Sequence, residues 1–154
     1  MIVEPRIEKN IRQLAATFDD DIASIWLCGS RANGGGMNGA DWDLVVFGER
    51  QVAEALERRS LPLGNDVDLR FVDVSSGEIK RLGKAAGWED FLAWDWIPLS
   101  ASLAEYQATQ LSEHLVTLGG EWVEAGTLAI TRKRAVRLWP EPEPGAPAAE
   151  SYVH

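Results

Sequence analysis

The chain has 154 residues, 45% of them hydrophobic, and carries a formal net charge of -9. This length predicts one hydrophobic core, because two independent domains of ordinary size need a longer chain. The excess of acidic residues argues against sequence-independent nucleic-acid binding, which relies on clustered lysines and arginines. The single cysteine, Cys28, excludes an intrachain disulfide bond and a cysteine-based zinc site.

The sequence also bears on the compartment. Residues 1–6 lack a basic region followed by an apolar stretch, and no apolar run approaches the length that spans a membrane. We therefore expect a cytoplasmic protein that does not bind membranes.

The first half of the chain has clear hydrophobic periodicity. Apolar residues at three- and four-residue steps predict an amphipathic helix over residues 8–18. Strands are predicted over residues 22–28, 41–47 and 66–74, and residues 51–59 have helical character. A glycine-rich loop, residues 29–36, follows the first strand directly.

The second half gives weaker signals. Residues 77–86 and 100–118 are predicted as helices, the latter with Ser100 as its N-cap and Gly119-Gly120 as its stop. Residues 127–139 suggest a short strand or hairpin around a basic tip, residues 132–134. The proline-rich residues 140–154 predict a mobile tail. We therefore predict an α/β (α+β) domain over residues 1–139, followed by that tail.

Residues 88–99 are rich in aromatic side chains, and the pattern does not predict their secondary structure. Trp88, Trp94 and Trp96 lie here beside Phe91 and Leu92. A base-stacking pocket and a docking site for a partner are two interpretations of the cluster. A role in the core or in an interface is favoured over both.

The most informative motif combines a Gly-Ser pair with two aspartates. Gly29 and Ser30 follow the first predicted strand, and Asp41 and Asp43 open the second after ten intervening residues. Side chains two apart on a strand share a face, so Asp41 and Asp43 are predicted to bind the same ion.

The third predicted strand offers a further carboxylate. Asp66 and Asp68 share the face predicted for the site, and Asp68 is the favoured third member. Arg70 lies on that face too, where a pairing with an aspartate is favoured over phosphate binding. Asp73 has the opposite parity and is expected to be structural.

This set of residues suits phosphate chemistry. Hard divalent cations such as Mg²⁺ prefer carboxylate, phosphate and water oxygens as ligands. A glycine turn lets backbone N–H groups approach phosphate oxygens, with the Ser30 hydroxyl as a further donor. Arg31 has two open interpretations, a phosphate contact and a solvated charge.

At these residues the sequence resembles the DNA polymerase beta nucleotidyltransferase superfamily, and among its members the minimal nucleotidyltransferases (MNT-like). The resemblance covers about residues 22–74 and rests on Gly29-Ser30-Arg31-Ala32, Ala40-Asp41-Trp42-Asp43-Leu44 and Val67-Asp68-Leu69. It implies a palm-like mixed β-sheet flanked by helices. It also implies Asp41, Asp43 and Asp68 as catalytic metal ligands, and Gly29, Ser30 and Arg31 as the nucleotide-binding residues.

The resemblance further implies an activity, which is transfer of a nucleoside monophosphate, AMP from ATP, to an acceptor with Mg²⁺ or Mn²⁺ as cofactor. Small members act as antitoxins that AMPylate a HEPN-type toxin, so such a protein is the leading candidate partner. One alternative is a small-molecule acceptor, as in antibiotic nucleotidyltransferases, in a pocket built by the C-terminal helix. The other is a non-catalytic module that neutralises a partner by contact, against which the intact aspartates argue.

Overall fold

The computed structural model describes residues 3–34, 41–59, 63–118 and 120–141, with the backbone alone over residues 109–118 and 121–129. Its helices are α1 (Pro5–Phe18), η1 (Asp19–Asp21), α2 (Gly29–Ala32), α3 (Arg50–Arg58) and η2 (Phe91–Trp94), where η marks a 3-10 helix. Its strands are β1 (Ile22–Cys28), β2 (Trp42–Gly48), β3 (Val67–Asp73), β4 (Glu78–Arg81), β5 (Glu89–Asp90), β6 (Ile97–Pro98), β7 (Leu103–Leu118) and β8 (Glu121–Trp139). Most of the predicted tail, from residue 142 on, lies outside the described residues.

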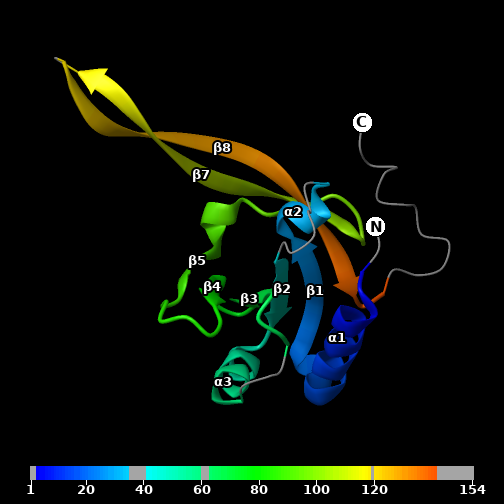
Figure 1. The fold of residues 1–154 in the computed structure, drawn as a ribbon. Helices are drawn as coiled ribbons and strands as arrows, with labels where there is room; N and C mark the ends of the chain where they lie inside the picture. Colours follow the sequence, from blue (N-terminus) through cyan, green and yellow to red (C-terminus); the bar gives the residue numbers. More distant parts are fainter. Residues whose placement is uncertain (1–2, 35–40, 60–62, 119, 142–154) are drawn as a thin grey trace.

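The described strands form one eight-stranded sheet in the order β5-β4-β3-β2-β1-β8-β7-β6. Only the β2–β3 pair among them is parallel, and every other neighbouring pair is antiparallel. The outermost strands, β5 and β6, are joined along the chain by η2 (Figure 1). The sheet therefore curls into a half-barrel whose two edges are linked by a short 3-10 helix.

This architecture corrects the predicted fold class. The expectation of an α/β (α+β) palm-like mixed sheet flanked by helices is wrong, because the chain is mostly sheet, with three short α-helices in its described part. The physical reason lies in the second half of the chain. Residues predicted as helices at 77–86 and 100–118 form β4 and β7 instead, and they extend the sheet where helices were expected to cover it.

The helices and strands predicted for the first half are confirmed, whereas the predicted glycine-rich loop begins with the helical turn α2. The helical periodicity over residues 8–18 corresponds to α1, and that over residues 51–59 to α3. The three predicted strands correspond to β1, β2 and β3 within one or two residues at their ends. These elements have a single dominant hydrophobic period, so local sequence identifies them.

A hydrophobic core fills the space between the sheet and helices α1 and α3. Alternate residues of β2, Trp42, Leu44 and Val46, are buried on this face, because side chains alternate along a strand. They pack with apolar residues of both helices, including Ile7, Ile11, Leu14, Val52 and Leu56, and with Phe71 of β3.

A second, aromatic cluster fills the inside of the curled sheet. Trp26 and Trp96 meet edge to face with ring centroids 5.2 Å apart, and Trp96 also lies 5.1 Å from Phe47. Phe91 of η2 contacts Phe47 and Trp96. Large rings brought in by η2 and the residues after it thus occupy the concave face, and this packing holds the two sheet edges near each other.

Strands β7 and β8 form a long antiparallel ribbon. β6 pairs with β7 at Ala104 and Glu105, and β1 pairs with β8 between Val136 and Trp139. From there β7 and β8 pair with each other, as far as Leu118 opposite Glu121. Figure 1 shows this ribbon leaving the body of the molecule. The basic residues expected at a hairpin tip, 132–134, instead lie along β8 near the body.

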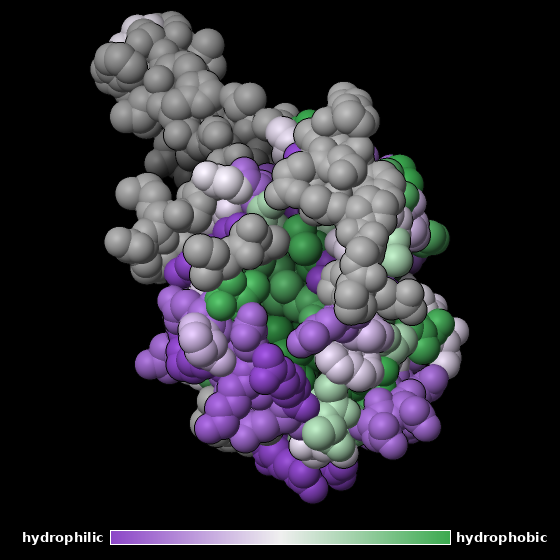
Figure 2. Space-filling model, turned by 90° about the vertical axis from the view of Figure 1, so that its right-hand side faces the viewer, coloured by the Kyte–Doolittle hydropathy of each residue, from purple (hydrophilic) through white to green (hydrophobic). Residues whose placement is uncertain are grey.

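The side of the molecule that carries α1 and the end of β8 is hollowed. A hollow of about 360 Å³ lies between these two elements, lined by Val3, Ile11, Leu138 and Trp139 among others. Figure 2 looks at the molecule from this side and shows apolar residues in the middle of the face with hydrophilic residues around them. Within the described residues, no helix is long and apolar enough to cross a membrane.

Gly48, at the end of β2, gives a test of this packing. A Cβ atom placed there would lie 2.5 Å from the carbonyl oxygen of Asp21 and 3.1 Å from the Phe71 ring. We expect Gly48→Ala to lower the free energy of unfolding by about 1–3 kcal/mol through overpacking. Urea denaturation measures the change, with Gly87→Ala as control, because a Cβ at Gly87 meets nothing within 4 Å. Equal stabilities of the two variants would contradict the packing described.

Candidate functional site

The predicted site residues meet where β1, β2 and β3 lie side by side. Gly29 follows the last residue of β1, and Asp43 lies opposite Cys28 in the register of β1 with β2. β2 and β3 are parallel neighbours, with Asp43 directly beside Asp68. The strands that were predicted separately therefore place these two carboxylate residues next to each other across the sheet.

Asp43, one of the predicted metal ligands, is partly buried in the site. Burial raises the pKa of Asp43 above its ordinary value, and the carboxylates of Asp68 and Asp41 raise it further, whereas Arg70 and Arg81 lower it. Gly29 packs against this side chain so closely that a Cβ atom at Gly29 would overlap Asp43 Oδ2. The glycine is thus required next to the carboxylate as well as for the turn.

Both carboxylate oxygens of Asp68 bind arginines. Arg70 Nη1 lies 3.1 Å from Asp68 Oδ2, and Arg81 Nε lies 2.8 Å from Asp68 Oδ1. The Asp68 side chain is 12% exposed, so these pairs are partly shielded from water. The expected pairing of Arg70 with a site aspartate is confirmed, and Arg81 is a second partner that the sequence did not indicate.

Asp41 precedes β2 and is exposed at the edge of the site. Its charge reaches Asp43, whose pKa it helps to raise. Within the residues that the structure describes, no three His, Cys, Asp or Glu side chains are grouped closely enough to hold a metal ion. The register of β2 with β3 brings Asp43 and Asp68 together, and Asp41 lies near them at the surface.

The predicted phosphate loop begins with a single helical turn, α2, which contains Gly29, Ser30 and Arg31. The guanidinium of Arg31 stacks over the Trp42 ring at 4.1 Å from its centroid. Asn33 ties the turn to β8: its Nδ2 donates to the carbonyl oxygens of Gly29 and Arg134, and its Oδ1 accepts from the Arg134 amide. The rest of the glycine run, Gly35 and Gly36, lies outside the described residues.

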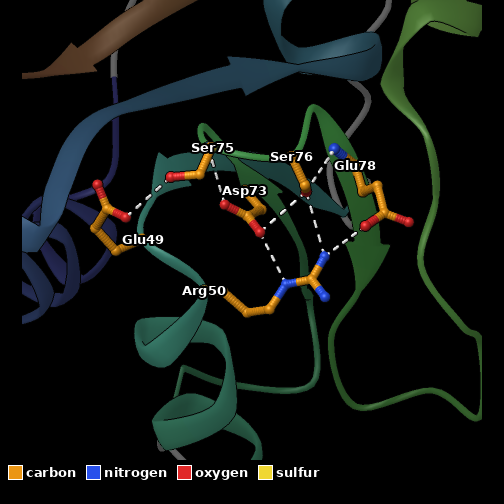
Figure 3. A network of polar contacts seen from close by, with 6 residues as sticks. All are labelled: Glu49, Arg50, Asp73, Ser75, Ser76 and Glu78. Carbon is orange, nitrogen blue, oxygen red and sulfur yellow. Dashed lines mark hydrogen bonds and ion pairs between the residues drawn. The ribbon is translucent and has the colours of Figure 1, made fainter.

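The two other aspartates of β3 and its approach have different surroundings. Asp66 pairs with Arg6 of α1 at 2.7 Å, and this ion pair lowers the pKa of Asp66. Asp73, expected to be structural, is buried and accepts hydrogen bonds from Arg50, Ser75 and Ser76 (Figure 3). Of the two candidates for the third position, only Asp68 lies beside Asp43.

A cavity of about 400 Å³ opens next to Asp43. It is lined by residues from β1, α2, β2, β3, η2 and β7: Cys28, Gly29, Asp43, Arg70, Ala93, Trp94, Tyr106, Gln107 and Ala108. Cys28 is buried, and burial raises the pKa of its thiol, which disfavours the reactive thiolate. Burial also raises the pKa of Tyr106 to about 12, so its hydroxyl stays protonated at neutral pH.

Sequence reasoning missed Tyr106 and left the place of Trp94 open. Tyr106 lies in the segment predicted as a helix, and a helix would not have placed its side chain beside Asp43. Alternation of Ala104, Tyr106 and Ala108 was the available signal, and it indicates a strand with one small-and-aromatic face. The position of Arg81 follows from the β3–β4 pairing alone.

No family model matches the chain, and no curated protein and no solved structure is significantly similar to it. The resemblance to nucleotidyltransferases therefore stays a prediction, and the geometry of the site carries the functional argument.

Proposed function

We propose that this protein is a metal-dependent nucleotidyltransferase that transfers AMP from ATP to an acceptor. In this reaction the acceptor oxygen bonds to the α-phosphorus, the bond from that phosphorus to the bridging oxygen breaks, and pyrophosphate leaves. The acceptor's proton passes to a carboxylate of the site. The observation that supports this most strongly is the register of Asp43 beside Asp68, directly next to the Gly29 turn.

The residues present fit a divalent cation in part. Asp41 and Asp43 offer oxygens to one hard cation, which typically takes one or two carboxylates together with substrate phosphates and water. Such an ion would supply charge neutralisation at the triphosphate. Asp68 is engaged by two arginines, so its contribution in this geometry is to hold Arg70 and Arg81 beside the site, where their charges favour phosphate.

A HEPN-type toxin remains the proposed acceptor, as the resemblance implies, and the cytoplasm the proposed compartment. The small-molecule alternative loses the pocket it expected from a C-terminal helix, since residues 103–118 form β7. The non-catalytic alternative gains support from the ion pairs that occupy both oxygens of Asp68. A binding experiment separates the catalytic proposal from the non-catalytic one.

We expect calorimetry to detect ATP binding by the wild type in the presence of Mg²⁺ and not in its absence. The Asp41→Ala, Asp43→Ala double variant removes the only carboxylates that the proposal assigns to the ion, so its affinity should fall at least about 100-fold. Asp66→Ala is the matched control, because this aspartate faces Arg6.

Either of two results would contradict the proposal. One is a folded wild type that binds no ATP with Mg²⁺ or Mn²⁺, which favours the non-catalytic module. The other is equal binding by the wild type and the double variant.

A further inference from the structure

The cavity beside Asp43 has the size and lining of a small-molecule site. Its volume, about 400 Å³, falls within the range of ligand pockets. One wall is aromatic, formed by Trp94 and Tyr106, and the polar groups on the other sides are few: Asp43, Arg70 and Gln107. A pocket with an aromatic wall and polar groups beside it can bind a planar ligand and orient it by hydrogen bonds.

The aromatic wall is built by stacked rings. Trp94 stacks on Tyr106 with ring centroids 5.3 Å apart and 30° between the planes, and Trp96 stacks on Tyr106 as well. Trp94 and Trp96 are both partly buried, and Trp94 is the one of the two that lines this cavity. Arg70 lies 5.8 Å from the centroid of the Trp94 ring and adds a cation next to the wall. Trp94 thus places a flat aromatic ring beside the charged part of the site.

Tyr106 connects this wall to the predicted phosphate loop. The backbone N–H of Gly29 donates to the Tyr106 hydroxyl oxygen at 2.9 Å. Gly29 and Asp43 also line the cavity, so the loop, the carboxylate and the aromatic wall share one opening. A ligand whose phosphates lie at Gly29 and Ser30 would have its other end beside Trp94.

We propose that the cavity is the nucleobase subsite, with the base of the nucleoside triphosphate stacked on Trp94. The inference rests on the proposed function and adds which part of the chain holds the base. Stacking on an aromatic side chain tolerates every base, because each has a π-face. The subsite therefore supplies affinity for the nucleoside rather than a strict choice among bases.

The test compares two ligands, Mg·ATP and Mg·tripolyphosphate, since the second has the phosphates and no base. We expect the wild type to bind ATP at least about tenfold more tightly than tripolyphosphate in calorimetry. Trp94→Leu should remove most of that difference, because it should lower the affinity for ATP about tenfold and leave the affinity for tripolyphosphate unchanged. Trp94→Phe, which keeps a ring, should retain most of the ATP affinity.

A second variant keeps the test valid if Trp94→Leu is unstable. Ala93 is exposed and lines the cavity. We expect Ala93→Leu to fill part of the cavity and to lower the affinity for ATP without changing the affinity for tripolyphosphate. Leu92→Ala is the control, because Leu92 lies on the same η2 segment, is 82% exposed, and does not line this cavity. Thermal unfolding establishes that each variant is folded.

Two results would overturn the subsite while leaving the proposed function intact: unchanged ATP affinity in Trp94→Leu and Ala93→Leu, or equal weakening of both ligands. Equal affinity of the wild type for ATP and tripolyphosphate would do the same. A wild type that binds neither ligand would overturn the subsite and the proposed function together.

Discussion

Replacing Asp73 by alanine is expected to lower the free energy of unfolding by about 3 kcal/mol at neutral pH. Asp73 is 4% exposed and joins β3 to the turn that follows it and to the first residue of α3. Its carboxylate accepts from the Ser75 amide at 3.0 Å, from Ser76 Oγ at 3.0 Å and from Arg50 Nε at 2.8 Å (Figure 3). The alanine variant leaves all three donors without this acceptor. Urea denaturation measures the loss.

The same residue gives a pH dependence of known sign. Burial alone would raise the pKa of Asp73, but hydrogen bonds from Ser75, Ser76 and Arg50 outweigh it and hold the pKa below its ordinary value. Asp73 therefore contributes its full stability above the pKa of the unfolded chain, about 3.9, and loses it as the pH falls through the folded pKa. The difference in the free energy of unfolding between the wild type and Asp73→Ala should therefore become smaller below about pH 4.

Asp66→Ala is the matched control for Asp73. Asp66 and its partner Arg6 both have well-exposed side chains. Ion pairs at the surface contribute little to the free energy of unfolding. We expect this variant to unfold at nearly the wild-type urea concentration. A loss as large as that of Asp73→Ala would mean that burial of the carboxylate is not what makes Asp73 important.

Gly29→Ala is expected to damage stability and nucleotide binding together. Gly29 has φ +69°, a conformation that costs a residue with a side chain about 1–2 kcal/mol, and its added Cβ would overlap Asp43 Oδ2. Relief of the overlap must displace Asp43, the central carboxylate of the proposed ion site. We expect a stability loss of about 2–4 kcal/mol and at least about a tenfold loss of Mg·ATP affinity.

Gly77→Ala separates the two causes. Gly77 has φ +73°, nearly that of Gly29, but a Cβ atom there meets nothing within 4 Å. This variant should show the backbone cost alone, about 1–2 kcal/mol, with ATP affinity unchanged. If Gly29→Ala behaves like Gly77→Ala in both measurements, the close packing of Gly29 on Asp43 has no functional role.

Local periodicity was sufficient for the first half of the fold. The pairs that matter for the site, β1 with β2 and β2 with β3, join elements close in sequence, so Asp43 and Asp68 were placed on one face from parity alone. Arg70 followed by the same reasoning. Parity does not give the distance between side chains. The ion pair of Asp68 with Arg81 depends on β4, a strand that was predicted as a helix.

The largest error, the helix expected over residues 100–118, has a physical explanation. This segment is rich in leucine, alanine, glutamate and glutamine, which favour helices, and Ser100 and Gly119-Gly120 resemble helix end signals. Its strand conformation is stabilised by pairing along its whole length with β8. Such pairing is non-local, so it overrides the local helix propensity, and within the segment only the alternation of Ala104, Tyr106 and Ala108 indicates a strand. Because β7 was not predicted, the cavity wall that Tyr106 forms was not predicted either.

The pairing of β1 with β8 has a consequence for how the molecule is made. β1 lies in the interior of the sheet, yet one of its neighbours, residues 136–139, comes from near the other end of the chain. A nascent chain thus carries an apolar strand with one unpaired edge until β8 has been synthesised, and such edges recruit other chains. Closing so long a loop costs entropy before any contact compensates for it, which slows folding. The topology therefore exposes the chain to aggregation while it is being synthesised.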